Sequence, residues 1–118
     1  MQILDEDKLH RRVPFLDPNY IRDDGTLTSY AFTLRKGENG LSVNLAKCIT
    51  YDKSISDKSK YRLYYLTAGY VQSIELLCVH DPQPDNFAHC LITGNITRSK
   101  SRKMAKAALL IRPGNDPH

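Results

Sequence analysis

The stretch from residue 61 to residue 81, YRLYYLTAGYVQSIELLCVHD, constrains the fold more than any other part of the chain. It is rich in aromatic and β-branched side chains, which favour strands, and one glycine, Gly69, interrupts it. We predict two strands from it, at about Arg62 to Leu66 and Val71 to Val79. Because two strands alone are marginally stable in water, further strands must pair with them.

Three shorter segments carry strand patterns that would extend this sheet. In residues 41–45, LSVNL, apolar side chains alternate with polar ones, as expected of a strand with one buried face. Residues 26–34, TLTSYAFTL, follow an Asp-Gly turn, and residues 88–94, AHCLITG, end in glycine. We therefore predict a mostly antiparallel sheet.

Helices are expected mainly at the two ends of the chain. A short helix is predicted around Asp5 to Arg12, and Asp17 can cap a single helical turn over Asn19 to Ile21. Near the C-terminus, SKSRKMAKAALLI is the best helix candidate, with Ser99 as its N-cap and a Pro-Gly pair as its stop. The charged, serine-rich residues 50–60 are predicted to form an exposed, mobile connection.

The composition agrees with a small globular protein. Of the 118 residues, 41% are hydrophobic and 25% are charged, and this length suits a single α+β domain over residues 1–118. No apolar run reaches the roughly 18 residues of a membrane helix, and the acidic N-terminus is unlike a signal peptide. Three cysteines without a C-x-x-C pair predict no disulfide framework. We expect a soluble, cytoplasmic protein with no membrane partner.

The net charge of +4 is concentrated at the C-terminal end. Six Lys or Arg residues and one acid follow residue 97, whereas the first 97 residues hold 11 bases and 12 acids. On the predicted C-terminal helix, Arg102, Lys103 and Lys106 share one sector. Such a face is either merely solvated or contacts nucleic acid, and no RNP, zinc-finger or helix-turn-helix pattern accompanies it.

The segment VHDPQPDNFAHCLI, residues 79–92, concentrates the polar side chains that could do chemistry. Its two prolines fix backbone angles and stiffen it, so it can be read as a rigid connection between two strands. The same stiffness would hold a polar site in a fixed geometry. In that interpretation His80 and His89 lie near the two ends, and Asp81 or Asp85 orients an imidazole ring.

A zinc site in this segment is the less favoured hypothesis. Cys78, His80, His89 and Cys90 offer the ligand types that zinc prefers. However, adjacent residues of a strand point to opposite faces, so His89 and Cys90 cannot both reach one ion from a regular strand. We therefore predict no metal and no cofactor. No G-x-S-x-G, Walker, G-x-G-x-x-G or H-E-x-x-H motif is present, so the sequence alone assigns no reaction.

Four separated elements of the chain resemble those of a known family. HRRVP, then DGTLTSYAF, then LSV, then PQPDNFAH are similar to a family of small, uncharacterised prokaryotic proteins with H-R-R-x-x-P, D-G-x-x-(S/T)-S-x-x-F, L-S-V and P-x-P-D-N-x-A-H elements. The resemblance runs from His10 to Ile92 and implies a shared site rather than a named reaction. A looser analogy is to ADP-ribosyltransferase-like folds, although the only late glutamate, Glu75, lies on a predicted strand.

Polar residues from four segments are what a convergent pocket would use. We predict a pocket for an anionic, nucleotide- or phosphate-like ligand, in which His89 exchanges a proton and Asp85 orients it. The alternative is a non-enzymatic toxin-antitoxin or defence-type protein that uses Arg102, Lys103 and Lys106 against nucleic acid or a protein partner. The candidate catalytic residues are His10, Arg11, Ser42, Asp85 and His89, and the candidate ligand-binding residues are Arg12, Ser29 and Asn86.

Overall fold

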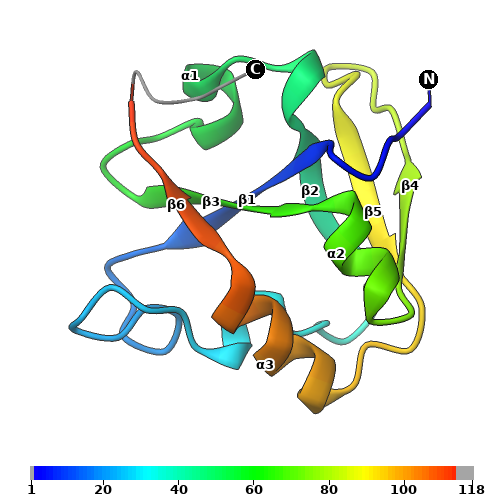
Figure 1. Cartoon of the computed structure of the whole chain (residues 1–118). Coiled ribbons are helices and arrows are strands. Elements are labelled where there is room, and N and C mark those ends of the chain that lie inside the picture. Colours follow the sequence, from blue (N-terminus) through cyan, green and yellow to red (C-terminus); the bar gives the residue numbers. More distant parts are fainter. Residues whose placement is uncertain (1, 114–118) are drawn as a thin grey trace.

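The fold is built on one six-stranded antiparallel sheet (Figure 1). The computed structural model describes residues 2–113. The strands are β1 (Lys8–Pro14), β2 (Leu41–Leu45), β3 (Tyr61–Thr67), β4 (Leu77–His80), β5 (His89–Thr93) and β6 (Leu109–Ile111). Their order across the sheet is β4-β5-β2-β1-β3-β6, so β1 lies near the centre and β4 and β6 are the edges. The predicted α+β class with an antiparallel sheet is confirmed.

Short helical elements cover both faces of the sheet. They are η1 (Ser29–Phe32), η2 (Ala46–Cys48), α1 (Tyr51–Ile55), α2 (Ala68–Ser73) and α3 (Arg98–Ala107). The larger core lies on one face, where Phe32, Val71 and Met104 from three of these helices pack with strand residues. On the other face α1 forms a smaller cluster through Ile55 and Leu63. None of the helices within residues 2–113 is long and apolar enough to cross a membrane.

Strand alternation decides which side chains face which layer. In β2, Leu41, Val43 and Leu45 are buried in the larger core, as the LSVNL pattern predicts, while Ser42 and Asn44 point to the opposite face, which we call the α1 face. In β5, Cys90 and Ile92 are buried in the same core. Over the part of the sheet that α1 does not cover, the α1 face carries the polar side chains of Ser42, Asn44 and His89. Toward the β4 edge, it carries the apolar side chains of Leu77, Val79 and Leu91.

The predicted N-terminal helix over residues 5–12 is wrong. Residues 8–14 form β1, which pairs with β3 along seven consecutive residues and with β2 at Leu9 and His10. Pairing with neighbours supplies the backbone hydrogen bonds that a helix would otherwise satisfy internally. The turn predicted after Asp17 is present, since the Asp17 carboxylate accepts from the N–H of Asn19 and its carbonyl from that of Tyr20.

Three further segments differ from prediction because a threonine starts a helix in each. Residues 29–32 of the predicted strand over 26–34 form η1 after Thr28, and residues 68–73, overlapping the strand predicted from Val71, form α2 after Thr67. The connection over 50–60 contains α1 after Thr50. In each case the threonine hydroxyl accepts a hydrogen bond from a backbone N–H two or three residues later, which satisfies a free donor of the first turn.

The predicted C-terminal helix is present, but it begins and ends at residues other than those predicted. Thr97, rather than Ser99, is the N-cap and accepts from the N–H of Lys100. The helix stops at Ala107, and the following Leu109–Ile111 is β6 instead of its last turn. This extended segment pairs with β3 and forms the outermost strand of the sheet on that side.

Candidate functional site

A row of polar side chains crosses the α1 face of the sheet. The strand register places Tyr65 opposite His10, His10 opposite Asn44, and Asn44 opposite His89. Residues opposite one another in antiparallel strands project to the same face. His10 and His89, which lie 79 positions apart in the chain, are therefore separated by one strand.

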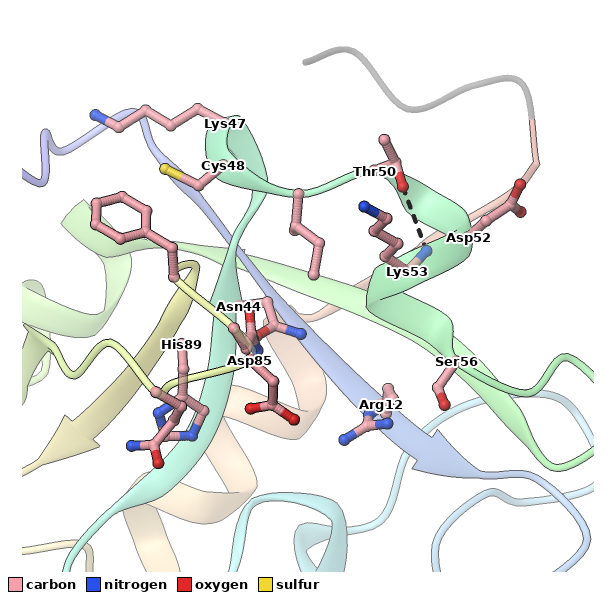
Figure 2. A pocket seen from close by; sticks show the side chains of 14 residues that line it. Arg12, Asn44, Lys47, Cys48, Thr50, Asp52, Lys53, Ser56, Asp85 and His89 are labelled. Atoms are coloured by element: carbon pink, nitrogen blue, oxygen red, sulfur yellow. Dashed lines mark hydrogen bonds between the residues drawn. The ribbon is translucent and has the colours of Figure 1, made fainter.

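The open half of this face is hollowed into a pocket of about 940 Å³ (Figure 2). One wall is the sheet, from which Arg12, Asn44 and His89 project. The second wall is the turn and helix after β2, and the third is the loop between β4 and β5. The lining residues are Arg12, Asn44, Lys47, Cys48, Ile49, Thr50, Asp52, Lys53, Ser56, Gln83, Asp85, Asn86, Phe87 and His89.

Backbone hydrogen bonds cross the β4–β5 loop, which its two prolines predict to be stiff. The N–H of Asp81 donates to the carbonyl of His89, and Gln83 and Asn86 exchange two backbone hydrogen bonds around Pro84 and Asp85. The loop therefore continues the β4–β5 hairpin, and the two hydrogen bonds between Gln83 and Asn86 close its tip. This closure places the Asp85 carboxylate and the Asn86 carboxamide at the pocket.

A chain of hydrogen bonds anchors that loop to the sheet and to α1. The Asn86 Nδ2 donates to Asn44 Oδ1 at 2.8 Å, and the Asn44 Nδ2 donates to Ser54 Oγ at 3.4 Å. Ser54 Oγ in turn lies 2.9 Å from Nδ1 of His10. Both Ser54 and His10 are fully buried, so this bond forms beneath the pocket floor rather than in the pocket. His10, a predicted catalytic residue, thus supports the site and does not line it.

His89 is held between two other polar side chains. Its Nδ1 lies 3.0 Å from the Asp81 carbonyl oxygen and 3.1 Å from the Asp81 carboxylate Oδ2. Its Nε2 lies 3.2 Å from Ser42 Oγ. Of the two aspartates considered for orienting this ring, Asp81 contacts it, whereas Asp85 stands at the pocket without such a contact.

The charges around the pocket are only partly compensated. Lys47 is paired with Asp7 at 2.7 Å, and Asp52 is paired with Lys58 at 2.8 Å. Arg12 and Lys53 form no ion pair with any carboxylate of residues 2–113, and Arg12 lies over the Tyr61 ring at 5.4 Å.

The pKa of Asp7 also reflects its pairing. Burial of Asp7 would raise the pKa of its carboxyl, but hydrogen bonds from Lys47 and from the N–H of Leu4 outweigh burial and lower it. Asp7 therefore stays ionised and holds Lys47 in place.

Two predicted site residues lie elsewhere. Arg11 is opposite Tyr64 and faces the larger core, where its Nε donates to the Ala31 carbonyl at 3.0 Å and its Nη1 to the Ser42 carbonyl at 2.8 Å. Burial lowers the pKa of Arg11 to about 10, which leaves the guanidinium charged at neutral pH. Ser29 begins η1 and lines hollows beside α3, on the opposite side of the sheet from the pocket.

The basic residues of α3 are placed as the sequence predicts, on its outer side. Arg102, Lys103 and Lys106 are exposed, while Ser101, Met104 and Ala105 are buried. Within residues 2–113, no group of three or more His, Cys, Asp or Glu side chains is arranged to hold a metal ion. Cys90 packs in the larger core, and Cys78 packs against it, away from the α1 face.

Sequence reasoning missed several residues of this site. Asn44 shares the polar side of LSVNL with Ser42, so the alternation alone could have identified it. Lys53 and Ser54 belong to the segment predicted to be a mobile connection. Asp81 was considered beside Asp85, and only the pairing of the Asp81 N–H with the His89 carbonyl distinguishes them.

Comparison of the chain with protein-family models, with curated proteins and with solved structures found no match.

Proposed function

We propose that the pocket on the α1 face binds an anionic ligand of nucleotide or phosphate type. The observation that carries this proposal is the pair of cations, Arg12 from β1 and Lys53 from α1, that line the pocket without an ion-pair partner among residues 2–113. Among the lining residues that the structure describes, Asp85 is the one carboxylate without an ion pair that opposes them. A planar guanidinium matches phosphate oxygens in two parallel hydrogen bonds.

The neutral lining favours a nucleotide over bare phosphate. Carboxamides and hydroxyls from Asn44, Asn86 and Thr50 offer hydrogen bonds to a ribose or base. Phe87 lines the pocket, has 56% of its surface exposed, and meets the His80 ring edge-on at 4.8 Å. An exposed aromatic ring of this kind can stack on a base. The volume of about 940 Å³ is sufficient for a ligand of nucleotide size.

Titration calorimetry with ADP and with pyrophosphate tests this proposal. Arg12→Gln and Lys53→Gln should each weaken binding about 5- to 20-fold, because each removes a charged donor whose interaction with the anion contributes about 1–2 kcal/mol. Lys36→Gln, in the exposed loop before β2, is the matched control and should leave the affinity unchanged. If neither probe binds, or if the control weakens binding as much as the two pocket variants, the anion-binding proposal is wrong.

A second candidate function rests on the outer side of α3. Arg102, Lys103 and Lys106 are exposed and form no ion pair with a carboxylate of the described chain. Such a face suits a toxin-antitoxin or defence-type protein that contacts nucleic acid or an acidic partner. Binding to duplex DNA or RNA should then weaken steeply with salt, and Lys103→Ala with Lys106→Ala should reduce the salt slope by about 2. Unchanged binding in this double variant would exclude the helix as the contact surface.

A further inference from the structure

Ser42, His89 and Asp81 form a hydrogen-bonded series at the edge of the pocket. Both groups beside His89 Nδ1, the carbonyl oxygen and the carboxylate Oδ2 of Asp81, are acceptors at 3.0 and 3.1 Å. Nδ1 must therefore carry a hydrogen. In a neutral ring Nε2 is then an acceptor, and the Ser42 hydroxyl at 3.2 Å donates to it.

Ser42 and His89 lie on neighbouring strands, and Asp81 directly follows β4. Asn44 pairs with His89 and Ser42 pairs with Leu91, so Ser42 and His89 are diagonal neighbours on the α1 face. The N–H of Asp81 donates to the carbonyl of His89 at 2.9 Å, which fixes the carboxylate beside the ring. The Arg11 guanidinium holds the carbonyl of Ser42 from the opposite face. Rigid strands position a reactive group more accurately than a loop does.

The location of this series indicates a role besides structural support. Ser42 is exposed and His89 lines the pocket, so a bound molecule can reach both. Water could replace a hydrogen bond between such accessible groups at little cost in stability. A hydroxyl that donates to an imidazole, itself oriented by a carboxylate, is the arrangement that activates serine as a nucleophile.

We propose that Ser42 is the nucleophile of an esterase site, with His89 as the general base and Asp81 as the positioning residue. The substrate class is a carboxylic ester that carries an anionic group, and this part rests on the proposed function. Lys53 would bind that anionic group in the pocket. Arg12 lies on the same face of the neighbouring strand, where its charge can stabilise an oxyanion formed above Ser42.

The reaction balances with water as the second reactant. Ser42 Oγ forms a bond to the acyl carbon while its proton passes to His89 Nε2, and the carbonyl oxygen becomes an oxyanion. The bond between the acyl carbon and the alcohol oxygen then breaks, and the alcohol takes the proton from Nε2. Water attacks the acyl-serine in the same way, which releases the carboxylic acid and restores the Ser42 hydroxyl. Asp81 stabilises the imidazolium in both steps.

Covalent labelling of Ser42 is the direct test. Diisopropyl fluorophosphate should modify the folded protein once, and peptide mapping should locate the adduct on Ser42. Ser42→Ala should abolish labelling, His89→Gln should slow it by at least about 100-fold, and Ser99→Ala, on an exposed turn of α3, should not change it. Circular dichroism of each variant checks that it is folded. No adduct on Ser42, or equal labelling rates in the wild type and a folded His89→Gln protein, would overturn the proposal.

Turnover separates this proposal from the anion-binding proposal. The probes are para-nitrophenyl acetate, which is neutral, and the mono-para-nitrophenyl ester of succinate, which is anionic. Both should be hydrolysed by the wild type and neither by Ser42→Ala, which should still bind ADP with unchanged affinity. Lys53→Gln should raise KM about 10-fold for the anionic ester only. Hydrolysis of both esters without that KM change would contradict the anionic-substrate assignment and leave the nucleophile assignment supported.

Measurement of kcat and of its pH dependence tests the role of Asp81. Asp81→Asn should lower kcat by about 10-fold rather than more, because the Asp81 carbonyl still accepts from Nδ1 and keeps the same tautomer. The wild-type rate should fall at acid pH, since a protonated ring cannot accept the serine proton. A rate that does not depend on pH, or an Asp81→Asn protein with unchanged kcat, would contradict the assignment.

Discussion

The Arg11 guanidinium donates a hydrogen bond to the backbone carbonyl of Ser42 at 2.8 Å from the core side of the sheet. Its Nε donates to the Ala31 carbonyl at 3.0 Å. The residue pairs between β1 and β2 are Leu9 with Leu45 and His10 with Asn44. Arg11 is the next residue of β1, and its side chain links the two strands where this pairing ends. One half-buried side chain thus joins β1, β2 and η1, and fixes the backbone of the serine on the opposite face.

Arg11 and Arg12 should therefore have opposite roles despite being adjacent. Arg11→Ala leaves two backbone carbonyls without their charged donor and should lower the free energy of unfolding by about 2–4 kcal/mol. Arg12→Ala removes an exposed side chain that forms no ion pair within residues 2–113, and should cost less than about 1 kcal/mol. Urea denaturation of both variants measures the difference. Equal losses would show that Arg11 is not the structural residue of the pair.

The buried bond between Ser54 and His10 should contribute measurably to stability. Ser54→Ala removes the hydroxyl that lies 2.9 Å from His10 Nδ1 and also accepts from Asn44. We expect a loss of about 1–3 kcal/mol in the free energy of unfolding, because buried polar groups lose a partner. Ser99→Ala, which changes an exposed serine, is the matched control and should cost less than about 0.5 kcal/mol. A Ser54→Ala protein as stable as the control would exclude this bond as a support of the site.

The sequence predicted the strands of the sheet where apolar and polar residues alternate or where β-branched and aromatic residues are frequent. Residues 41–45, 62–66 and 88–94 show apolar residues at every second position or β-branched and aromatic content, and each forms a strand. The helices were less predictable because all but η2 are started by a threonine, a residue that also favours strands. Thr67 illustrates the ambiguity, since it ends β3 and caps α2 at once.

The sequence predicted which segments contribute residues to the site, but it predicted fewer of the contacts between them. The sequence identified His89, Ser42, Arg12 and Asn86, and the structure brings them to one face of the sheet. Arg11 is on the other face because adjacent strand residues point in opposite directions, and this became evident only once residues 8–14 were seen to form a strand. Ser54 could not be expected while its segment was taken for a mobile connection.

The ion pair between Asp7 and Lys47 should make part of the stability depend on pH. The pKa of Asp7 is lowered from its ordinary value of 3.8, so the native state releases this proton more readily than the unfolded chain does. The stabilisation is therefore complete above the ordinary pKa and is lost as the pH falls through the native value. Asp7→Asn should be about 0.5–1.5 kcal/mol less stable than the wild type at pH 7, and the difference should disappear in acid.

Urea denaturation at several pH values between about 2 and 7 measures this difference. Asp5→Asn, an exposed carboxylate two residues away, is the control and should follow the wild type at every pH. Lys47→Met should remove the same stabilisation, and combining it with Asp7→Asn should add little, because the two residues share one interaction. A difference between Asp7→Asn and the wild type that stays constant down to the lowest pH would contradict the lowered pKa of Asp7.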